Sequence, residues 1–405
     1  MNNQVKGNID FALLAIVALL LLIGVSSVYS ATYDAGASVY FHRQLIWIGI
    51  GALVMFSIML LPYRTLQLVS YPLYGMSILI LLAVLAAGKT VAGSKAWFGV
   101  QGYGLQPSEV VKLTTVLALA SFLSQRQVNL HRMKDVAIAF GIVLLPVVLI
   151  ILQPDMGTAI TYLGAFVPIL YWAGATNFLM LALLAPAAAA IAALFGTTAF
   201  VVVIGATFAL LFLLRENRFV SAIVFSITVT VGVCVQFVFG KLAPYQQKRI
   251  FTFINPDADP LGAGYNVLQS KIAIGSGGLF GKGYLQGSQT QLNFIPAQWT
   301  DFIYCVPSEE FGFLGAFLIL LLLTLLLYRG VRLASTVKSG YASIAAIGVV
   351  SLFAVHIVIN IGMAMGMMPV IGVPLPFMSY GGSNLLTNMA MVGLLLNLYA
   401  NRKEY

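Results

Sequence analysis

Residues 10–30 read DFALLAIVALLLLIGVSSVYS, an almost unbroken apolar run about as long as a helix that crosses a bilayer. Eleven further runs of similar length follow, at 44–62, 68–87, 108–124, 136–152, 157–173, 179–195, 199–214, 219–240, 312–328, 342–364 and 385–400. Hydrophobic residues make up 60% of the chain and charged residues only 8%, whereas roughly a quarter of a soluble domain is charged. The sequence therefore predicts an all-α integral membrane protein, a polytopic bundle of about ten to twelve transmembrane helices in a single domain, 1–405.

Basic residues indicate the orientation of these helices. If the N-terminus lies inside, the short connections on that side hold 12 of the 21 Lys and Arg residues: Lys6, Arg64, Arg126, Arg132, Lys134, Arg215, Arg218, Arg329, Arg332, Lys338, Arg402 and Lys403. This pattern obeys the positive-inside rule and predicts that both termini are cytoplasmic. It also predicts that residues 180–214 form two segments around Gly196, because one crossing would place Arg215 and Arg218 outside. A cleaved signal peptide remains the alternative to an uncleaved first helix.

Nine basic residues do not fit this orientation signal, because they fall on or near the predicted outer surface: Arg43, Lys89, Lys95, Lys112, Lys241, Lys248, Arg249, Lys271 and Lys282. Positive charge on that side indicates an anionic substrate. The net charge of +9 does not indicate nucleic acid, since the bases form no basic arm with interleaved aromatics. Three glycine-rich outer loops, 88–107, 241–311 and 365–384, are long enough to build a site, and the extracytoplasmic loop 241–311 is the longest.

Two acidic motifs flank this predicted outer surface. Ser108 is expected to be the N-cap of the fourth helix, with Glu109 in its first turn. Lys112 lies on the same helical face as Glu109, inside an apolar run, where ionisable groups usually mark a site. The pair is interpreted as facing the substrate, with a purely structural salt bridge as the alternative. Asp155, in the turn before the sixth helix, is equally open to a capping or a substrate role.

The glycine-rich turn 274–283 does not bind a nucleotide in the manner of a P-loop. That motif needs glycine at 276 and serine or threonine at 283, where this chain has Ser276 and Gly283. No nucleotide cofactor is predicted. Exposed N–H groups beside Lys271 and Lys282 are suited to a phosphate, although turn geometry alone is an equal explanation. The cysteines, Cys234 and Cys305, predict no disulfide, and the three histidines no zinc site.

Asp301 is the candidate catalytic residue, because it stands among aromatic and aliphatic residues in the segment 294–304. Apolar surroundings raise the pKa of a carboxyl group towards the range useful for a general base. An acid that stabilises the loop through backbone N–H groups is the alternative. Glu309 and Glu310 are expected to compensate the dipole of the tenth helix. Ser383 or Asn384 is expected to cap the last helix, whose N–H groups also suit an anion.

Together these residues resemble the SEDS family of bacterial cell-wall glycosyltransferases, and its RodA (rod-shape) branch more than its FtsW (division) branch. The resemblance runs nearly end to end and is carried by Gln106-Pro107-Ser108-Glu109 with Lys112, Gln153-Pro154-Asp155, the stretch 259–275, Thr300-Asp301-Phe302-Ile303 and Ser379-Tyr380-Gly381-Gly382-Ser383. The branch assignment depends on Pro244-Tyr245-Gln246 and Gln289-Thr290-Gln291-Leu292.

The resemblance implies polymerisation of lipid II into glycan strands at the outer face of the bacterial cytoplasmic membrane, for cell elongation and rod shape. Asp301 matches the family's essential aspartate. The implied partners are a class B penicillin-binding protein as transpeptidase, proteins of the elongation complex and membrane lipids, and a divalent cation, Mg²⁺ or Mn²⁺, is the implied cofactor. The residues expected to bind substrate are Lys95, Glu109, Lys112, Asp155, Lys271, Lys282, Ser379, Gly381, Gly382 and Ser383.

Leaving-group chemistry explains why one carboxylate is enough. Glycosidases typically use two, but pyrophosphate departs without a proton. Asp301 would take the proton of the acceptor's GlcNAc 4-hydroxyl, while Lys112, Lys271, Lys282 or the cation stabilises the departing pyrophosphate. A lipid II transporter and a non-catalytic scaffold for the transpeptidase are the alternative functions.

Three features depart from the family pattern. Ala96 stands in Lys95-Ala96-Trp97 where arginine is usual, so the phosphate contact there falls to Lys95. Trp299 stands two residues before Asp301, where histidine is common. The region 179–240 adds a pair of helices to the usual ten, and an even number preserves the topology.

Overall fold

The computed structural model of the chain describes residues 9–33, 38–91, 93–100, 103–214, 217–241, 247 and 264–402. Several sequence predictions lie outside these residues: those on Lys6, Arg215, Lys248, Arg249, Lys403, 244–246 and most of 259–264.

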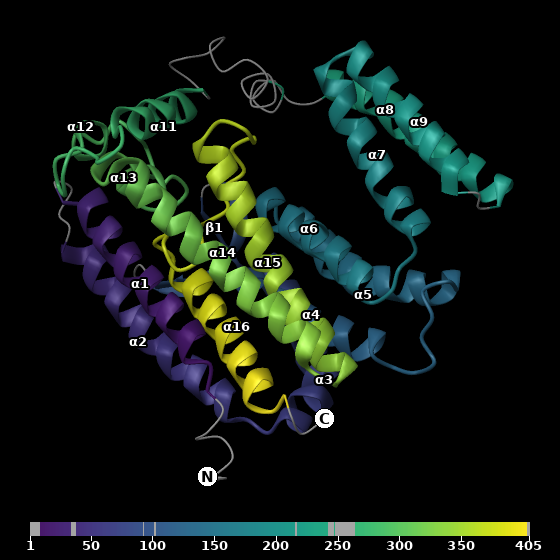
Figure 1. Cartoon of the computed structure of the whole chain (residues 1–405), viewed down its shortest axis with the longest axis horizontal. Coiled ribbons are helices and arrows are strands. Elements are labelled where there is room, and N and C mark those ends of the chain that lie inside the picture. Colours follow the sequence, from purple (N-terminus) through teal and green to yellow (C-terminus); the bar gives the residue numbers. More distant parts are fainter. Residues whose placement is uncertain are drawn as a thin grey trace. The chain divides into compact units, whose positions relative to one another are not determined.

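Every predicted apolar run coincides with a helix (Figure 1). The helices are α1 (Phe11–Ala31), α2 (Ser38–Leu60), α3 (Tyr63–Ala87), α4 (Pro107–Leu123), α5 (Met133–Leu152), α6 (Met156–Trp172), α7 (Asn177–Phe195), α8 (Thr197–Leu214), α9 (Arg218–Lys241), α14 (Gly312–Thr336), α15 (Gly340–Ala364) and α16 (Gly382–Ala400). Within the described ranges, 9 of the helices are long and apolar enough to cross a membrane. The chain is thus a polytopic helical protein, as predicted.

The chain divides into two compact units. One comprises residues 1–129, 134–169 and 266–405, and the other comprises 130–133 and 170–265. In the smaller unit, α7 packs against α8 and α9. Gly196 separates α7 from α8 with a φ of 124°, which confirms that residues 180–214 form two helices. The single domain predicted for 1–405 stays a prediction.

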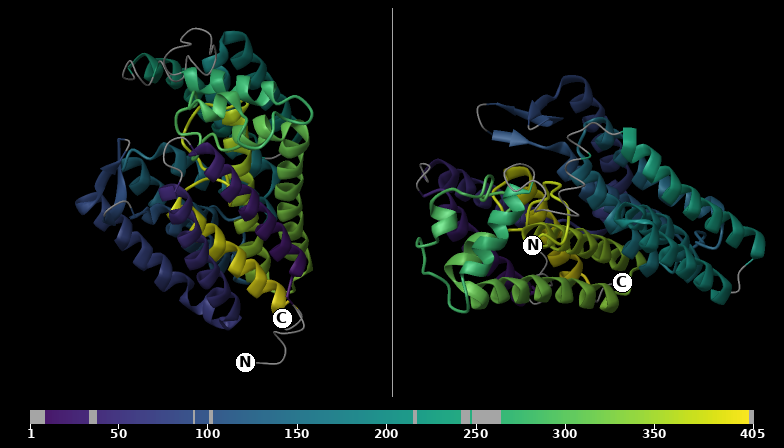
Figure 2. Two further views of the ribbon diagram at one scale, coloured as in Figure 1. Left: turned by 90° about the vertical axis from the view of Figure 1, so that its left-hand side faces the viewer. Right: turned by 90° about the horizontal axis from the view of Figure 1, so that it is seen from above.

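Figure 2 shows the helices from two further sides. In the larger unit, α4, α15 and α16 are buried along most of their length. The buried residues of α15 and α16 lie on nearly every side of each helix, which is typical of helices at the centre of a bundle. Helix α16 packs against α2, and α15 packs against α4 and α14. The candidate site is built where these central helices meet two loops.

The loops predicted to lie on the outer side contain secondary structure that the sequence did not predict. Residues 89–105 form an antiparallel sheet of three strands, β1 (Lys89–Val91), β2 (Ser94–Val100) and β3 (Tyr103–Leu105), in the order β1-β2-β3. The register pairs Lys89 with Trp97 and Phe98 with Leu105. The long loop 241–311 contains the short helices α11 (Tyr265–Ser276), α12 (Ser288–Gln291) and α13 (Cys305–Glu310). Asp301 lies between the last two.

Candidate active site

Asp301 is half-buried in a turn that its own segment builds. The backbone N–H groups of Thr300 and Asp301 both donate to the carbonyl of Ala297, at 3.1 and 3.2 Å. The flanking side chains of Ile295, Phe302 and Ile303 are buried. Burial in these surroundings raises the pKa of the Asp301 carboxyl above its usual 3.8, and a hydrogen bond from Thr300 lowers it by a smaller amount. The direction is the one expected for a general base.

The loop 365–381 and helix α15 hold this turn through three consecutive carbonyl groups. The carbonyl of Trp299 accepts from the backbone N–H of Tyr380 at 2.9 Å, and the carbonyl of Thr300 accepts from the Ser379 hydroxyl at 2.6 Å. The carbonyl of Asp301 accepts from the Asn360 amide at 2.8 Å. The structure thus brings two predicted site residues, Asp301 and Ser379, into neighbouring positions.

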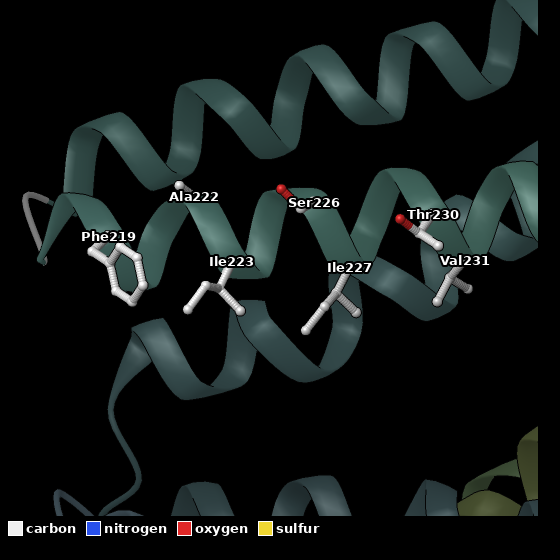
Figure 3. A pocket seen from close by; sticks show the side chains of 7 residues that line it. All are labelled: Phe219, Ala222, Ile223, Ser226, Ile227, Thr230 and Val231. Carbon is white, nitrogen blue, oxygen red and sulfur yellow. The ribbon is translucent and has the colours of Figure 1, made fainter.

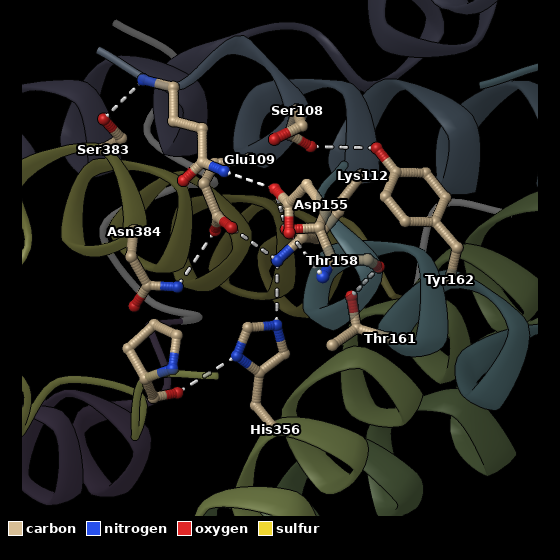
Figure 4. A network of polar contacts seen from close by, with 12 residues as sticks. Ser108, Glu109, Lys112, Asp155, Thr158, Thr161, Tyr162, His356, Ser383 and Asn384 are labelled. Atoms are coloured by element: carbon tan, nitrogen blue, oxygen red, sulfur yellow. Dashed lines mark hydrogen bonds and ion pairs between the residues drawn. The ribbon is translucent and has the colours of Figure 1, made fainter. Parts of the chain in front are cut away.

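The Glu109–Lys112 pair forms a second polar centre, inside the helical bundle (Figure 4). The Lys112 Nζ lies 2.7 Å from Glu109 Oε1, and the two side chains are only 2% and 6% exposed. Asn384 donates to Glu109 Oε2 at 3.0 Å. Lys112 also lies 2.9 Å from His356 Nε2, and the other ring nitrogen of His356 lies 3.1 Å from the Pro374 carbonyl. Since a carbonyl only accepts, Nδ1 carries the proton and Nε2 accepts from Lys112.

Asp155 and Ser383 meet the start of α4 at the same centre (Figure 4). Asp155 caps α6 by accepting from the Thr158 N–H at 3.1 Å, so the predicted capping role is confirmed. It also accepts from the Gln106 amide at 2.6 Å. Ser383 accepts from the Gln106 backbone N–H at 2.8 Å and donates to the Gly104 carbonyl at 3.1 Å.

Both helix caps predicted from serine or asparagine are wrong. Helix α4 begins at Pro107 with Gln106 as the N-cap, because proline already has the backbone angle of a first helical residue, so Ser108 lies inside the helix. Helix α16 begins at Gly382, with Gly381 as the N-cap and no side-chain cap. A Cβ atom on Gly382 would lie 2.1 Å from the Trp47 ring, so this glycine is needed for packing.

The predicted lysines are in different surroundings. Lys282 is paired with Glu309, with Nζ 2.7 Å from Oε1, and also donates to the Ser288 hydroxyl at 2.7 Å. Lys95 is bonded to the Ala86 carbonyl at 3.0 Å, on the exposed sheet. Lys271 is exposed on α11, and its Cδ lies 3.2 Å from the position of a Cβ atom on Gly366. Of these three lysines, Lys271 is therefore the one seen to border the loop that holds Asp301.

Glu309 and Glu310 differ from the prediction, since their carboxyl groups face loop donors. Glu309 accepts from the N–H groups of Gln289 and Thr290 at 2.9 and 3.0 Å. Although burial raises the pKa of Glu309, these bonds and Lys282 lower it below its usual value overall. Burial raises the pKa of Glu310, which accepts from the Ser30 hydroxyl and from the Leu285 N–H.

The sequence did not predict the contacts of four residues that connect these groups. Gln106 donates to Asp155, and Asn384 donates to Glu109. The other two residues are His356 and Asn360 on α15. A signal was present for the last two, because polar residues four apart in an apolar run share one helical face. What they contact depends on the fold of residues 365–381, which periodicity does not give.

Two cavities lie away from these residues. One, of about 380 Å³, is lined by one face of α9: Phe219, Ala222, Ile223, Ser226, Ile227, Thr230 and Val231 (Figure 3). It has no titratable side chain and offers no catalytic group. The other, of about 650 Å³, is lined by Asp10, Arg329, Arg332, Leu333, Thr336, Lys338, Tyr399 and Arg402, and contains no predicted site residue.

The helices and the site define a polytopic membrane protein in which one half-buried carboxylate on a loop is held against the central helices. The sequence matches the cell cycle protein family of FtsW, RodA and SpoVE over residues 8–200 and 179–404. The chain therefore belongs to this family, the SEDS family, as a member of RodA type, and is a multi-pass protein of the cytoplasmic membrane.

Curated relatives span almost the whole chain. Stage V sporulation protein E of Bacillus subtilis is 37% identical, with 97% of each chain covered. The peptidoglycan glycosyltransferase RodA of Treponema pallidum is 33% identical, over 98% of this chain and 100% of the relative. The peptidoglycan glycosyltransferase MrdB of Escherichia coli K12 is also 33% identical, over 98% and 95%.

Solved structures agree with this assignment. A chain of a peptidoglycan synthase complex, described for its coordination of polymerization and crosslinking, is 29% identical with a TM-score of 0.74, covering 98% of this chain and 99% of its own. The rod shape determining protein RodA of Thermus thermophilus is 28% identical with a TM-score of 0.65, covering 98% of each chain.

Proposed function

We propose that this chain is a peptidoglycan glycosyltransferase that polymerises lipid II at the outer face of the cytoplasmic membrane during cell elongation. The observation that carries the proposal is Asp301: the residue is half-buried, its carboxyl group has a raised pKa, and its backbone is held by the Ala297 carbonyl and the Asn360 amide. Full-length similarity to RodA and MrdB supports the same activity.

Asp301 acts as the general base. It accepts the proton of the acceptor's GlcNAc 4-hydroxyl as that oxygen forms a bond to C1 of the donor's MurNAc. The bond from C1 to the phosphate oxygen breaks, and undecaprenyl pyrophosphate leaves with the electron pair and needs no proton. A second carboxylate, as in the glycosidases, is therefore unnecessary.

Positive charge for the pyrophosphate is assigned first to Lys271. This lysine is exposed and borders Gly366 in the loop that also contacts Asp301, whereas Lys282 is already neutralised by Glu309. Lys112 is only 2% exposed and pairs with Glu109, so its contribution to substrate binding is indirect. A lysine near a leaving pyrophosphate stabilises the charge that develops in the transition state.

The described residues do not fit a dedicated metal cage, because they contain no group of three or more His, Cys, Asp or Glu side chains. Mg²⁺ commonly binds through substrate phosphates and only one or two carboxylates. We therefore propose that Mg²⁺ or Mn²⁺ binds together with the pyrophosphate and neutralises part of its charge.

The proposed partner is a transpeptidase, specifically a class B penicillin-binding protein, together with other proteins of the elongation complex. The structural similarity to a chain of a complex that couples polymerization and crosslinking supports a transpeptidase partner. The finer assignment to class B comes from the family resemblance.

Polymerisation of lipid II by the purified chain with its transpeptidase, with and without EDTA, tests this function. Asp301→Asn should abolish polymer formation, and Asp135→Asn, on a partly exposed carboxylate bonded to the Asn129 N–H, is the matched control. Continued polymerisation by Asp301→Asn would refute the catalytic role. Lipid II translocation is measured in parallel, with the same variants in lipid vesicles, to separate polymerisation from transport. If Asp301→Asn lost translocation but still polymerised lipid II, the chain would be a transporter.

A further inference from the structure

Asn360 connects the two loops of the candidate site. It is 0% exposed on α15, and its Nδ2 donates to the carbonyl of Asp301 and to the carbonyl of Val373, each at 2.8 Å. An amide group carries two N–H bonds, so each carbonyl receives one. The two acceptors are 72 residues apart in sequence, one in the turn of Asp301 and the other in the loop 365–381.

His356 holds the next residue of that loop from one helical turn away. Its Nδ1–H donates to the Pro374 carbonyl at 3.1 Å, and its Nε2 accepts from Lys112 at 2.9 Å. Residues four apart on a helix share a face. His356 and Asn360 therefore bind Pro374 and Val373 from the same face of α15. A connection therefore runs from Glu109 and Lys112 to His356, along the loop residues that His356 and Asn360 bind, and from Asn360 to Asp301.

We propose that Asn360 is a positioning residue, which sets the place of Asp301 relative to the substrate, and that His356 fixes the other end of the same connection at Lys112. This inference rests on the proposed role of Asp301 as the general base. Its physical reason is that a general base acts only at hydrogen-bond distance from the proton it removes. A displacement of about 1 Å costs on the order of 100-fold in rate.

Asn397 offers a matched control within the same chain. It is also 0% exposed, and its two Nδ2–H bonds are shared among three backbone carbonyls, those of Ile58, Met59 and Leu61, at 3.0, 3.0 and 2.7 Å. Asn397→Leu therefore removes the same kind of contact, a buried amide that donates to backbone carbonyls, far along the sequence from Asp301.

The experiment compares Asn360→Leu with Asn397→Leu in the full-length protein with its transpeptidase and lipid II. We expect Asn360→Leu to lower kcat by on the order of 100-fold with little change in KM, and to shift the acid limb of the pH profile as the surroundings of Asp301 change. Asn397→Leu should lower thermal stability by a similar amount and leave kcat and the acid limb in place.

Equal effects of the two leucine variants on kcat, with an unchanged acid limb, would show that Asn360 is only structural. If a leucine variant does not fold, Asn360→Ser and Asn397→Ser give the same comparison, because serine is too short to reach both carbonyls. His356→Gln, which keeps a donor and an acceptor, should retain most of the activity that His356→Leu loses. Activity in Asp301→Asn would overturn the proposed function itself, whereas an inactive Asp301→Asn beside an active Asn360→Leu would overturn only this inference.

Discussion

The Oδ2 atom of Asp301 lies 3.5 Å from the position that a Cβ atom would occupy on Gly372. Gly372 has a φ of 72°, in the left-handed region, where residues with a side chain are strained. At Gly372 the loop 365–381 therefore passes beside the carboxylate without a side chain. The carbonyl of the next residue, Val373, accepts from Asn360. Glycine at 372 leaves the space next to Asp301 open.

Replacing Gly372 should affect catalysis more than folding. Gly372→Ala costs about 1 kcal/mol of backbone strain and places a methyl group against the carboxylate, so we expect kcat to fall while the protein still folds. Gly174→Ala is the control, since Gly174 has a φ of 93° and open space around its Cβ position. Equal kcat values in the two variants would contradict a role for the space beside Asp301.

The pH dependence of polymerisation follows from the surroundings of Asp301. Because burial raises its pKa above the usual 3.8, activity should be present above that raised value and lost as the pH falls through it. Thr300→Val removes the hydrogen bond that lowers the pKa, so the acid limb of kcat should move to higher pH. Thr324→Val, in exposed surroundings on α14, is the control and should not move it. A shift of the limb to lower pH in Thr300→Val would refute this account.

The sequence predicted the helices well because each is encoded by its own apolar run. It also predicted the break at Gly196 and the apolar surroundings of Asp301, which are local properties. The sheet at 89–105 was missed, since its strands are short and lie in a glycine-rich loop. The cap of α16 was misplaced because Ser383 instead accepts from Gln106, a residue 277 positions away. The cap of α4 was misplaced because Pro107 takes the first helical position.

The connecting residues of the site could not be predicted for the same reason. His356 and Asn360 appear in the sequence as isolated polar residues of an apolar helix, and many such residues only satisfy nearby backbone. Their partners, Pro374 and Val373, become adjacent to them only when the loop 365–381 folds back on α15. Asp301 and the Glu109–Lys112 pair, which are far apart in sequence, are thus connected by contacts that form only in the tertiary structure.

Glu309 and Glu310 are adjacent and fully buried, and neutralising them is expected to lower stability by different amounts. Glu309→Gln removes the charge that binds Lys282 and two backbone N–H groups, and should destabilise the protein by about 2–3 kcal/mol. Glu310 has a raised pKa and an Oε2 atom with no partner among the described residues, so its charged form is less stabilised than that of Glu309 and Glu310→Gln should cost less. Thermal unfolding in detergent measures both, and equal losses would contradict this difference.

Removing charges also distinguishes the two roles predicted for the Glu109–Lys112 pair, a role in the site and a purely structural salt bridge. Lys112→Met leaves a buried carboxylate without its cation and should destabilise the protein by about 3–5 kcal/mol. The double variant Glu109→Gln/Lys112→Met removes both charges and should recover most of that stability. It should not recover kcat, because methionine cannot donate to His356.

A second buried ion pair provides a control for this double variant. Arg329, near the C-terminal end of α14, pairs with the buried Asp10. Asp10→Asn/Arg329→Met removes an ion pair in the same way, but no hydrogen bond or ion pair among the described residues joins this pair to Asp301, so the kcat of this variant should stay near that of the unchanged protein. If the Glu109→Gln/Lys112→Met variant regained both stability and kcat, the pair would be only a structural salt bridge. If it regained stability alone, Lys112 would support catalysis indirectly through His356, because the fold would be intact while the contact to His356 was missing.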